Sequence, residues 1–189
     1  MNNVAALLIA LTAAITGQTV SQTELRQTNA AYEYMDEYSL TVNKTTNCVT
    51  VYQKTTTGDF VPVKAMICSV GKDDYNNETP SGSYKTQAKY EWRPLFGNVY
   101  GQYATRINGH ILFHSVYYKT TDPSSLKTEE YNKLGTSASA GCVRLTAADA
   151  KWIYDNCSLG TTVNIIERDS DPLPRPEAIK LGSNAPYPN

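Results

Sequence analysis

Short runs of β-branched and aromatic residues, each ended by turn-forming residues, are the feature that most limits how this chain can fold. Valine, isoleucine, threonine and tyrosine suit a half-buried pleated strand, whereas glycine, asparagine, aspartate and proline end one. The predicted strands are 39–42, 48–52, 61–70, 83–86, 103–107, 111–116 and 161–166. The sequence therefore predicts a mainly β domain.

One segment, 147–156, has the period of a helix instead. Ala150 and Ile153 recur at helical spacing within it. Thr146, directly before the segment, can accept a hydrogen bond from the N–H groups of the first turn. We therefore expect one clear helix.

The chain of 189 residues is long enough for one ordinary domain with tails. We interpret it as a leader at 1–17, a polar linker at 18–37, a folded domain at 38–168 and a Pro-rich extended tail at 169–189. The apolar run from Val4 to Ile15 has the length of a signal-peptide core and is too short to span a bilayer. A buried N-terminal helix is the alternative. We expect an exported protein with no transmembrane span in the mature chain.

The charges exclude some classes of partner. The formal net charge is -1, and the 17 basic and 18 acidic side chains are scattered along the chain. This pattern argues against nucleic acid as a partner. The two histidines, His110 and His114, would stand about 13 Å apart on one strand, too far to bind one metal ion. We expect no metal site and no cofactor.

Two of the four cysteines can be placed by strand pairing. A turn centred near Gly58 would set residues whose numbers sum to about 116 opposite each other, so that Val49 faces Ile67. Cys48 would then lie opposite Cys68, within reach of a disulfide. A bridge and two half-buried free thiols both remain open.

A third cysteine, Cys142, lies in the string S-A-S-A-G-C-V-R-L. Small neighbours leave room for a substrate beside the sulfur, and a helix start at 147 together with Arg144 would favour the thiolate. A buried structural thiol is the alternative. A catalytic thiol needs a base, and His114 is the candidate, because His110 adjoins a turn and is expected to be solvated.

The strings F-H-S-V at 113–116 and S-A-G-C-V-R at 139–144 resemble the signature of the L,D-transpeptidase catalytic domain, the YkuD family. Further matches are T-P-S-G at 79–82, G-H-I-L-F-H-S, and the helical string D-A-K-W-I-Y-D-N-C followed by G-T-T-V. Together they cover about 38–166. The resemblance implies a mixed β-sandwich of the L,D-transpeptidase type with one helix after the cysteine.

The resemblance also implies roles for the site residues. Cys142 would be the nucleophile, His114 the general base, and the Ser115 carbonyl the group that orients the imidazole. Arg144 would hold a substrate carboxylate or form a structural ion pair. The other candidates for oxyanion or substrate binding are Ser139, Ala140 and Gly141.

Two departures from the family pattern stand out. Ala140 occupies the position where the family usually has histidine, which would weaken oxyanion stabilisation or substrate positioning. The interval between His114 and Cys142 is also longer than usual, and 117–134 is predicted to form a polar lid.

The function implied is acyl transfer on the cell-wall side of a bacterial membrane. Cys142 would form a thioester with a peptidoglycan tetrapeptide stem and pass it to an amine, and carbapenem-type β-lactams would inhibit the enzyme. One alternative is an L,D-carboxypeptidase that uses water, and another is a catalytically silent wall-binding module. A sortase-like enzyme lacks support because no T-L-x-T-C string precedes the cysteine, and papain-like enzymes place cysteine before histidine.

Overall fold

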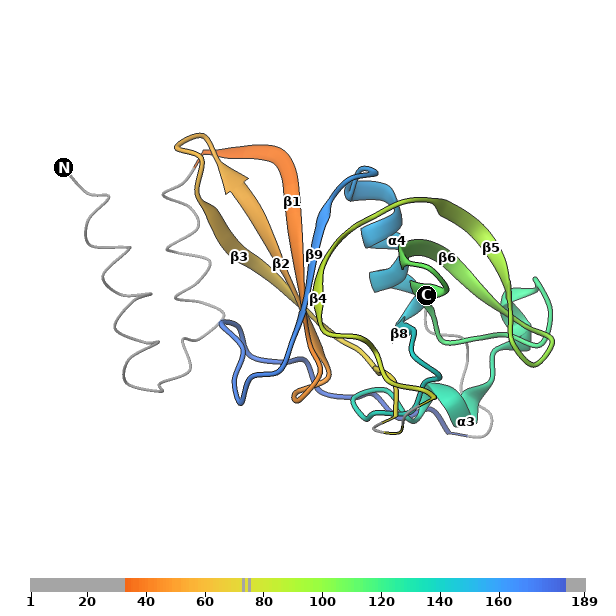
Figure 1. Cartoon of the computed structure of the whole chain (residues 1–189). Helices are drawn as coiled ribbons and strands as arrows, with labels where there is room; N and C mark the ends of the chain where they lie inside the picture. Colours follow the sequence, from red (N-terminus) through yellow and green to blue (C-terminus); the bar gives the residue numbers. More distant parts are fainter. Residues whose placement is uncertain (1–32, 73, 75, 183–189) are drawn as a thin grey trace.

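The structure is a computed structural model that describes residues 33–72, 74 and 76–182. Two sheets and one main helix make up these described residues (Figure 1), which confirms the predicted mainly β fold. The five-stranded sheet has the order β3-β2-β1-β9-β4. Its strands are β1 (Tyr34–Asn43), β2 (Cys48–Thr55), β3 (Phe60–Ile67), β4 (Gly82–Lys85) and β9 (Thr162–Ile166). β1 is parallel to β9, and the other pairs are antiparallel.

The four-stranded sheet carries the candidate site and has the order β5-β6-β7-β8. Its strands are β5 (Lys89–Leu95), β6 (Val99–Asn108), β7 (Ile111–Ser115) and β8 (Val143–Leu145), with β7 and β8 parallel. The connection between these two strands holds the 3-10 turn η1 (Pro123–Ser125) and the short helix α3 (Thr128–Tyr131).

The predicted helix is present as α4 (Ala147–Asn156) and packs against β6, β7 and β8. The Thr146 hydroxyl accepts a hydrogen bond from the Asp149 N–H at 3.0 Å, as the sequence predicted for its cap. Ala150 and Ile153 are fully buried. They join one core cluster with side chains from both sheets, so α4 ties the two sheets together.

Strand β5 was missed because Pro94 argues against a strand interior. The structure places β5 at the edge of the four-stranded sheet, where a missing N–H costs least, and Pro94 pairs with Tyr100. β8 was also missed, because three residues are too few to show a period. β1 begins at Tyr34, earlier than predicted.

The predicted register of β2 and β3 is wrong by two residues next to the turn and by one residue further along the strands. Val49 pairs with Met66, and Cys48 pairs with Ile67. An irregularity after Val51, near Pro62 on the partner strand, shifts the pairing. Cys68 lies beyond the end of β3, and both cysteines are free thiols with no solvent exposure. The structure therefore contains two free thiols, fully rather than half buried, in place of a bridge.

The described part of the predicted tail is extended, yet it is bound to the domain. The Asn43 amide donates to Arg168 O and to Asp171 Oδ1, each at 2.9 Å. Leu173 is buried, and the Leu181 N–H donates to Asn132 Oδ1 at 2.7 Å. The predicted leader and nearly all of the linker lie outside the described residues. Within the described ranges, no helix is long and apolar enough to cross a membrane.

Candidate active site

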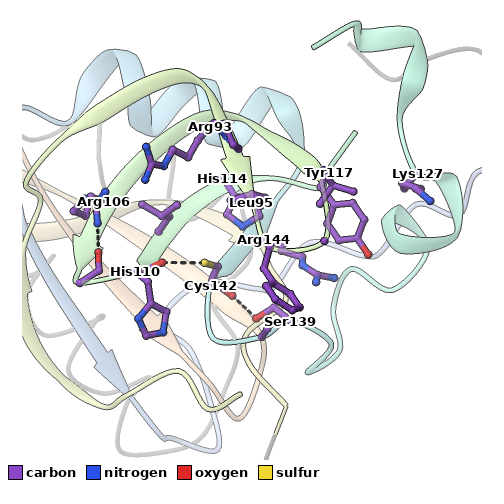
Figure 2. A pocket seen from close by; sticks show the side chains of 17 residues that line it. Arg93, Leu95, Arg106, His110, His114, Tyr117, Lys127, Ser139, Cys142 and Arg144 are labelled. Atoms are coloured by element: carbon purple, nitrogen blue, oxygen red, sulfur yellow. Dashed lines mark hydrogen bonds between the residues drawn. The ribbon is translucent and has the colours of Figure 1, made fainter. Parts of the chain in front are cut away.

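The parallel pairing of β7 and β8 sets which side chains share a face. Phe113 pairs with Val143 and His114 with Arg144. Because paired residues point to the same side and successive residues alternate, Cys142 shares its face with His114 and Arg144. Phe113 and Val143 point into the core and are fully buried. Cys142 and His114 thus line one cavity of about 750 Å³ (Figure 2).

His114 is held in one tautomer. Its Nδ1 lies 2.6 Å from the carbonyl oxygen of Ser115, which can only accept, so Nδ1 carries the proton and Nε2 is a free base. Only 2% of the residue is exposed. Burial lowers the pKa of His114 to about 4, against the opposing effect of the Ser115 carbonyl and with help from the Arg144 charge. The imidazole is therefore neutral at neutral pH.

Gly101 on β6 lies against the His114 ring, a contact that the sequence analysis missed. A Cβ at this position would come within 2.8 Å of His114 Nδ1 and 2.9 Å of Cγ. An isolated glycine within the strand-like string V-Y-G-Q-Y was the available signal, because such a glycine often marks a close approach.

Cys142 rests as a thiol. Burial raises its pKa, and the Leu112 N–H and the Arg144 charge offset this only in part. Cys142 does not lie in the first turn of a helix, because β8 separates it from α4 along the chain. The thiol donates to the His110 carbonyl at 3.5 Å, and within the described chain no hydrogen bond joins it to His114. His110 itself is solvent-exposed, as expected.

The loop before Cys142 is tightly held. The Ser139 hydroxyl donates to Cys142 O at 2.5 Å and accepts from the Gly141 N–H at 3.1 Å. Gly141 has φ +105°, a conformation that strains any residue with a Cβ. Its N–H, one of the predicted oxyanion donors, is thus already hydrogen-bonded. Ala140 lines the cavity beside it.

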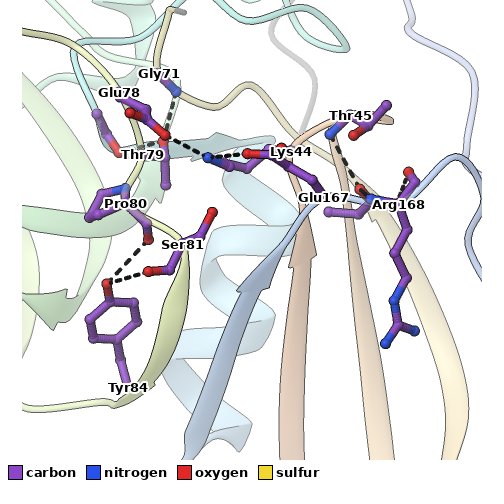
Figure 3. Close-up of polar contacts among 12 residues, drawn as sticks. Lys44, Thr45, Gly71, Glu78, Thr79, Pro80, Ser81, Tyr84, Glu167 and Arg168 are labelled. Atoms are coloured by element: carbon purple, nitrogen blue, oxygen red, sulfur yellow. Dashed lines mark hydrogen bonds and ion pairs between the residues drawn. The ribbon is translucent and has the colours of Figure 1, made fainter. Parts of the chain in front are cut away.

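The T-P-S-G turn, whose polar contacts are drawn in Figure 3, is hydrogen-bonded to this loop. The buried Thr79 hydroxyl donates to Gly141 O at 2.8 Å and accepts from the Gly71 N–H at 2.7 Å. Lys44 pairs with Glu78 at 2.8 Å and with a second carboxylate on Glu167 at 2.7 Å. The turn therefore connects the cysteine loop to the five-stranded sheet.

Arg144 forms an ion pair, one of its two predicted roles. It contacts Glu130 at 2.9 Å, with side chains only 11% and 17% exposed, and stacks 4.8 Å from the Tyr117 ring centre. Both partners belong to the segment 117–134. The segment, which was predicted to be a polar lid, also has an apolar part, because Tyr131 and Leu134 pack in a small apolar cluster. Arg144 ties the segment to β8.

The hairpin of β5 and β6 supplies the remaining wall of the cavity. Arg93, Leu95 and Phe96 line it from β5 and the turn, and Arg106 lines it from β6. The sequence analysis named none of these residues. Among the described residues, no group of three or more His, Cys, Asp and Glu side chains could hold a metal ion.

Comparison with known proteins places this geometry in a family. The model of the L,D-transpeptidase catalytic domain, YkuD, matches residues 37–165. The "Putative L,D-transpeptidase YciB" of Bacillus subtilis (strain 168) is 39% identical over 110 residues, which are 54% of this chain and 55% of that protein. The chain thus spans about half the length of this relative.

Solved structures share the fold. An L,D-transpeptidase from Mycobacterium smegmatis superposes with a TM-score of 0.52 and 21% identity, over 68% of this chain and 58% of the other. The L,D-transpeptidase LdtMt1 in complex with imipenem superposes with a TM-score of 0.50 and 21% identity, over the same shares. Since the family model covers well over half of the sequence, this chain belongs to the YkuD family of L,D-transpeptidase catalytic domains.

Proposed function

We propose that this chain is a peptidoglycan L,D-transpeptidase that acts outside the cytoplasm, with Cys142 as nucleophile and His114 as general base. The observation that carries the proposal is the shared face of β7 and β8. It holds a thiol and an imidazole with a free Nε2 in one cavity. Family membership supplies the substrate class.

Acylation begins from neutral partners. The Cys142 thiol turns from the His110 carbonyl toward His114 Nε2, which takes its proton as Sγ attacks the amide carbonyl between the third and fourth stem residues. The protonated imidazole then gives this proton to the departing amine of the fourth residue. The C–N bond breaks, and the C–S bond of a thioester remains.

An amine of a second stem resolves the thioester. It attacks the same carbonyl, His114 accepts the amine proton, and the returned proton restores the Cys142 thiol. An imidazole with a pKa of about 4 returns its proton readily to a departing amine, but it is a weak acceptor for the proton of a thiol with a raised pKa. The proton transfer from Cys142 therefore accompanies the attack of Sγ instead of preceding it. With the Gly141 N–H hydrogen-bonded to Ser139, we assign the oxyanion contact to the Cys142 N–H.

Two alternatives keep the same site. In the first, water takes the place of the amine, and the enzyme is an L,D-carboxypeptidase. In the second, the enzyme is slow or silent because Ala140 replaces the histidine usual in the family. The cavity and the fixed His114 tautomer favour an active enzyme, because a binding module has no need of a basic Nε2 beside a thiol.

Intact-mass analysis after exposure to imipenem tests the proposal. The imipenem complex of LdtMt1 makes this probe the natural choice. We expect one adduct, which Cys142→Ala abolishes and Cys157→Ala retains. The absence of an adduct, together with failure of iodoacetamide to label Cys142, would favour the silent module. Products from a stem with and without an added amine separate transfer from hydrolysis.

A further inference from the structure

Two arginines occupy the hairpin wall of the cavity, away from the Arg144 ion pair. Arg93 on β5 is the cross-strand partner of Gly101, the residue that lies against His114, so its side chain projects on the His114 face. Arg106 on β6 lines the same cavity. Figure 2 shows both on one side of Cys142, with Arg144 on the other.

Tyr90 holds the two guanidinium groups in place. The guanidinium carbon of Arg93 lies 4.7 Å from the Tyr90 ring centre, and that of Arg106 lies 5.7 Å from it. Arg106 also donates to the Tyr90 hydroxyl at 3.1 Å and to the carbonyl of Gly109. Arg93 is thus held by an aromatic ring, and Arg106 by the same ring and by two neutral oxygens.

The charge on this side of the cavity is not balanced. Arginine stays protonated at all physiological pH values, and within the described residues neither Arg93 nor Arg106 forms an ion pair with Asp or Glu. The described lining of the cavity contains no acidic side chain. Arg144, by contrast, has Glu130 as its counter-ion.

We propose that Arg93 and Arg106 form a carboxylate-binding subsite for the stem peptide, which rests on the function proposed above. Two ordered guanidinium groups match the planar, two-oxygen edge of a carboxylate. Two carboxylates of the stem could bind there. One is the C-terminal carboxylate of the departing fourth residue, and the other is a side-chain or main-chain carboxylate on the donor side, that is, on the residues up to and including the one whose carbonyl is attacked. With either carboxylate bound, the scissile amide would lie between the two arginines and the segment 117–134.

Three synthetic tetrapeptide stems distinguish the sources. One has all its carboxylates free, the second has the chain end converted to an amide, and the third has only its donor-side carboxylates converted to amides. Release of the fourth residue, or of its amide, is measured for each stem. We expect wild type to process one of the two modified stems about 10-fold or more slowly than the free stem, because a lost charge-assisted contact has that effect.

Arg93→Gln and Arg106→Gln test the residues themselves. We expect each variant to release the fourth residue of the free stem about 10-fold more slowly than wild type does. Its rate with the modified stem that wild type processes slowly should stay within about twofold of the wild-type rate. Arg168→Gln, an exposed arginine on the C-terminal segment, is the matched control and leaves both rates unchanged. Iodoacetamide labelling of Cys142 stays within about twofold in all variants, which shows that the nucleophile and the fold are intact.

Calorimetric binding to Cys142→Ala separates this inference from the catalytic proposal. The subsite is supported if Cys142→Ala binds the free stem more tightly than a modified stem and if adding Arg93→Gln removes this preference. If wild type then releases no product, only the transpeptidase proposal fails. Equal binding of all three stems, or equal slowing of all three by the arginine variants, overturns the subsite.

Discussion

Cys48 and Cys142 both have raised thiol pKa values, but they differ in what surrounds the sulfur. Cys48 lies in β2 with no exposed surface, and burial together with the Asp171 charge raises its pKa to about 12. Cys142 also has a raised pKa, but its sulfur faces a cavity, an N–H group and a cation. Full burial makes a thiol such as Cys48 inert, whereas Cys142 lines the cavity that also holds His114, and we propose that it ionises only during reaction.

The largest effect should come from removing the sulfur in each region. We expect Cys142→Ala to lower stem turnover by about 1,000-fold or more, because the thioester route is lost. Cys48→Ala should keep turnover within about twofold. Steady-state release of the fourth stem residue measures both, and a large loss in the Cys48 variant would break the contrast.

Native alkylation should separate the thiols next. At pH 8, iodoacetamide should label Cys142 at least about 100-fold faster than Cys48, Cys68 and Cys157, since all three are fully buried with raised pKa values. Peptide mapping after timed quenching gives the four rates. Labelling of the other three should match Cys142 only after unfolding in urea.

The buried imidazole of His114 should make the stability of the fold depend on pH. The folded pKa of His114, about 4, lies below the ordinary value near 6.5, so the unfolded chain binds more protons between these limits. Stability is then fully present above pH 6.5 and is lost as the pH falls toward 4. From pH 7 to 4.5 we expect a loss of about 2–3 kcal/mol from this residue.

Urea titrations at the two pH values measure this loss, with His114→Gln as the reference. The part of the pH dependence that the variant lacks belongs to His114. Identical curves for wild type and variant would mean that the imidazole is protonated as readily in the folded state as in the unfolded one.

A smaller effect is expected at Gly101. In Gly101→Ala, the new methyl group would meet the His114 ring at 2.8 Å, so the imidazole must shift away from the Ser115 carbonyl. We expect kcat to fall about 10-fold, with KM little changed, because the base is displaced while the rest of the cavity remains. Gly182→Ala, at a position with open space and no positive φ, serves as the control for adding a methyl group.

Local patterns predicted much of this molecule. Most strand runs and the helix at 147–156 with its Thr146 cap follow from residue type and spacing between near neighbours. The contact of His114 with the Ser115 carbonyl was expected only from the resemblance to the family. The register of β2 and β3 could not be predicted, because the hairpin is centred on Thr57 and not on Gly58, and an irregularity near Pro62 then shifts the pairs beyond it.

The sequence by itself determined which residues can ionise, which residues favour turns, and which strings match a family. Only the tertiary structure decided their state, because a pKa depends on burial and on charges brought from distant parts of the chain. Arg144 meets Glu130 from the lid, and Gly101 meets His114 across two strands. Arg93 and Arg106 reach the same Tyr90 ring only because β5 pairs with β6, an arrangement that no short string of residues reveals.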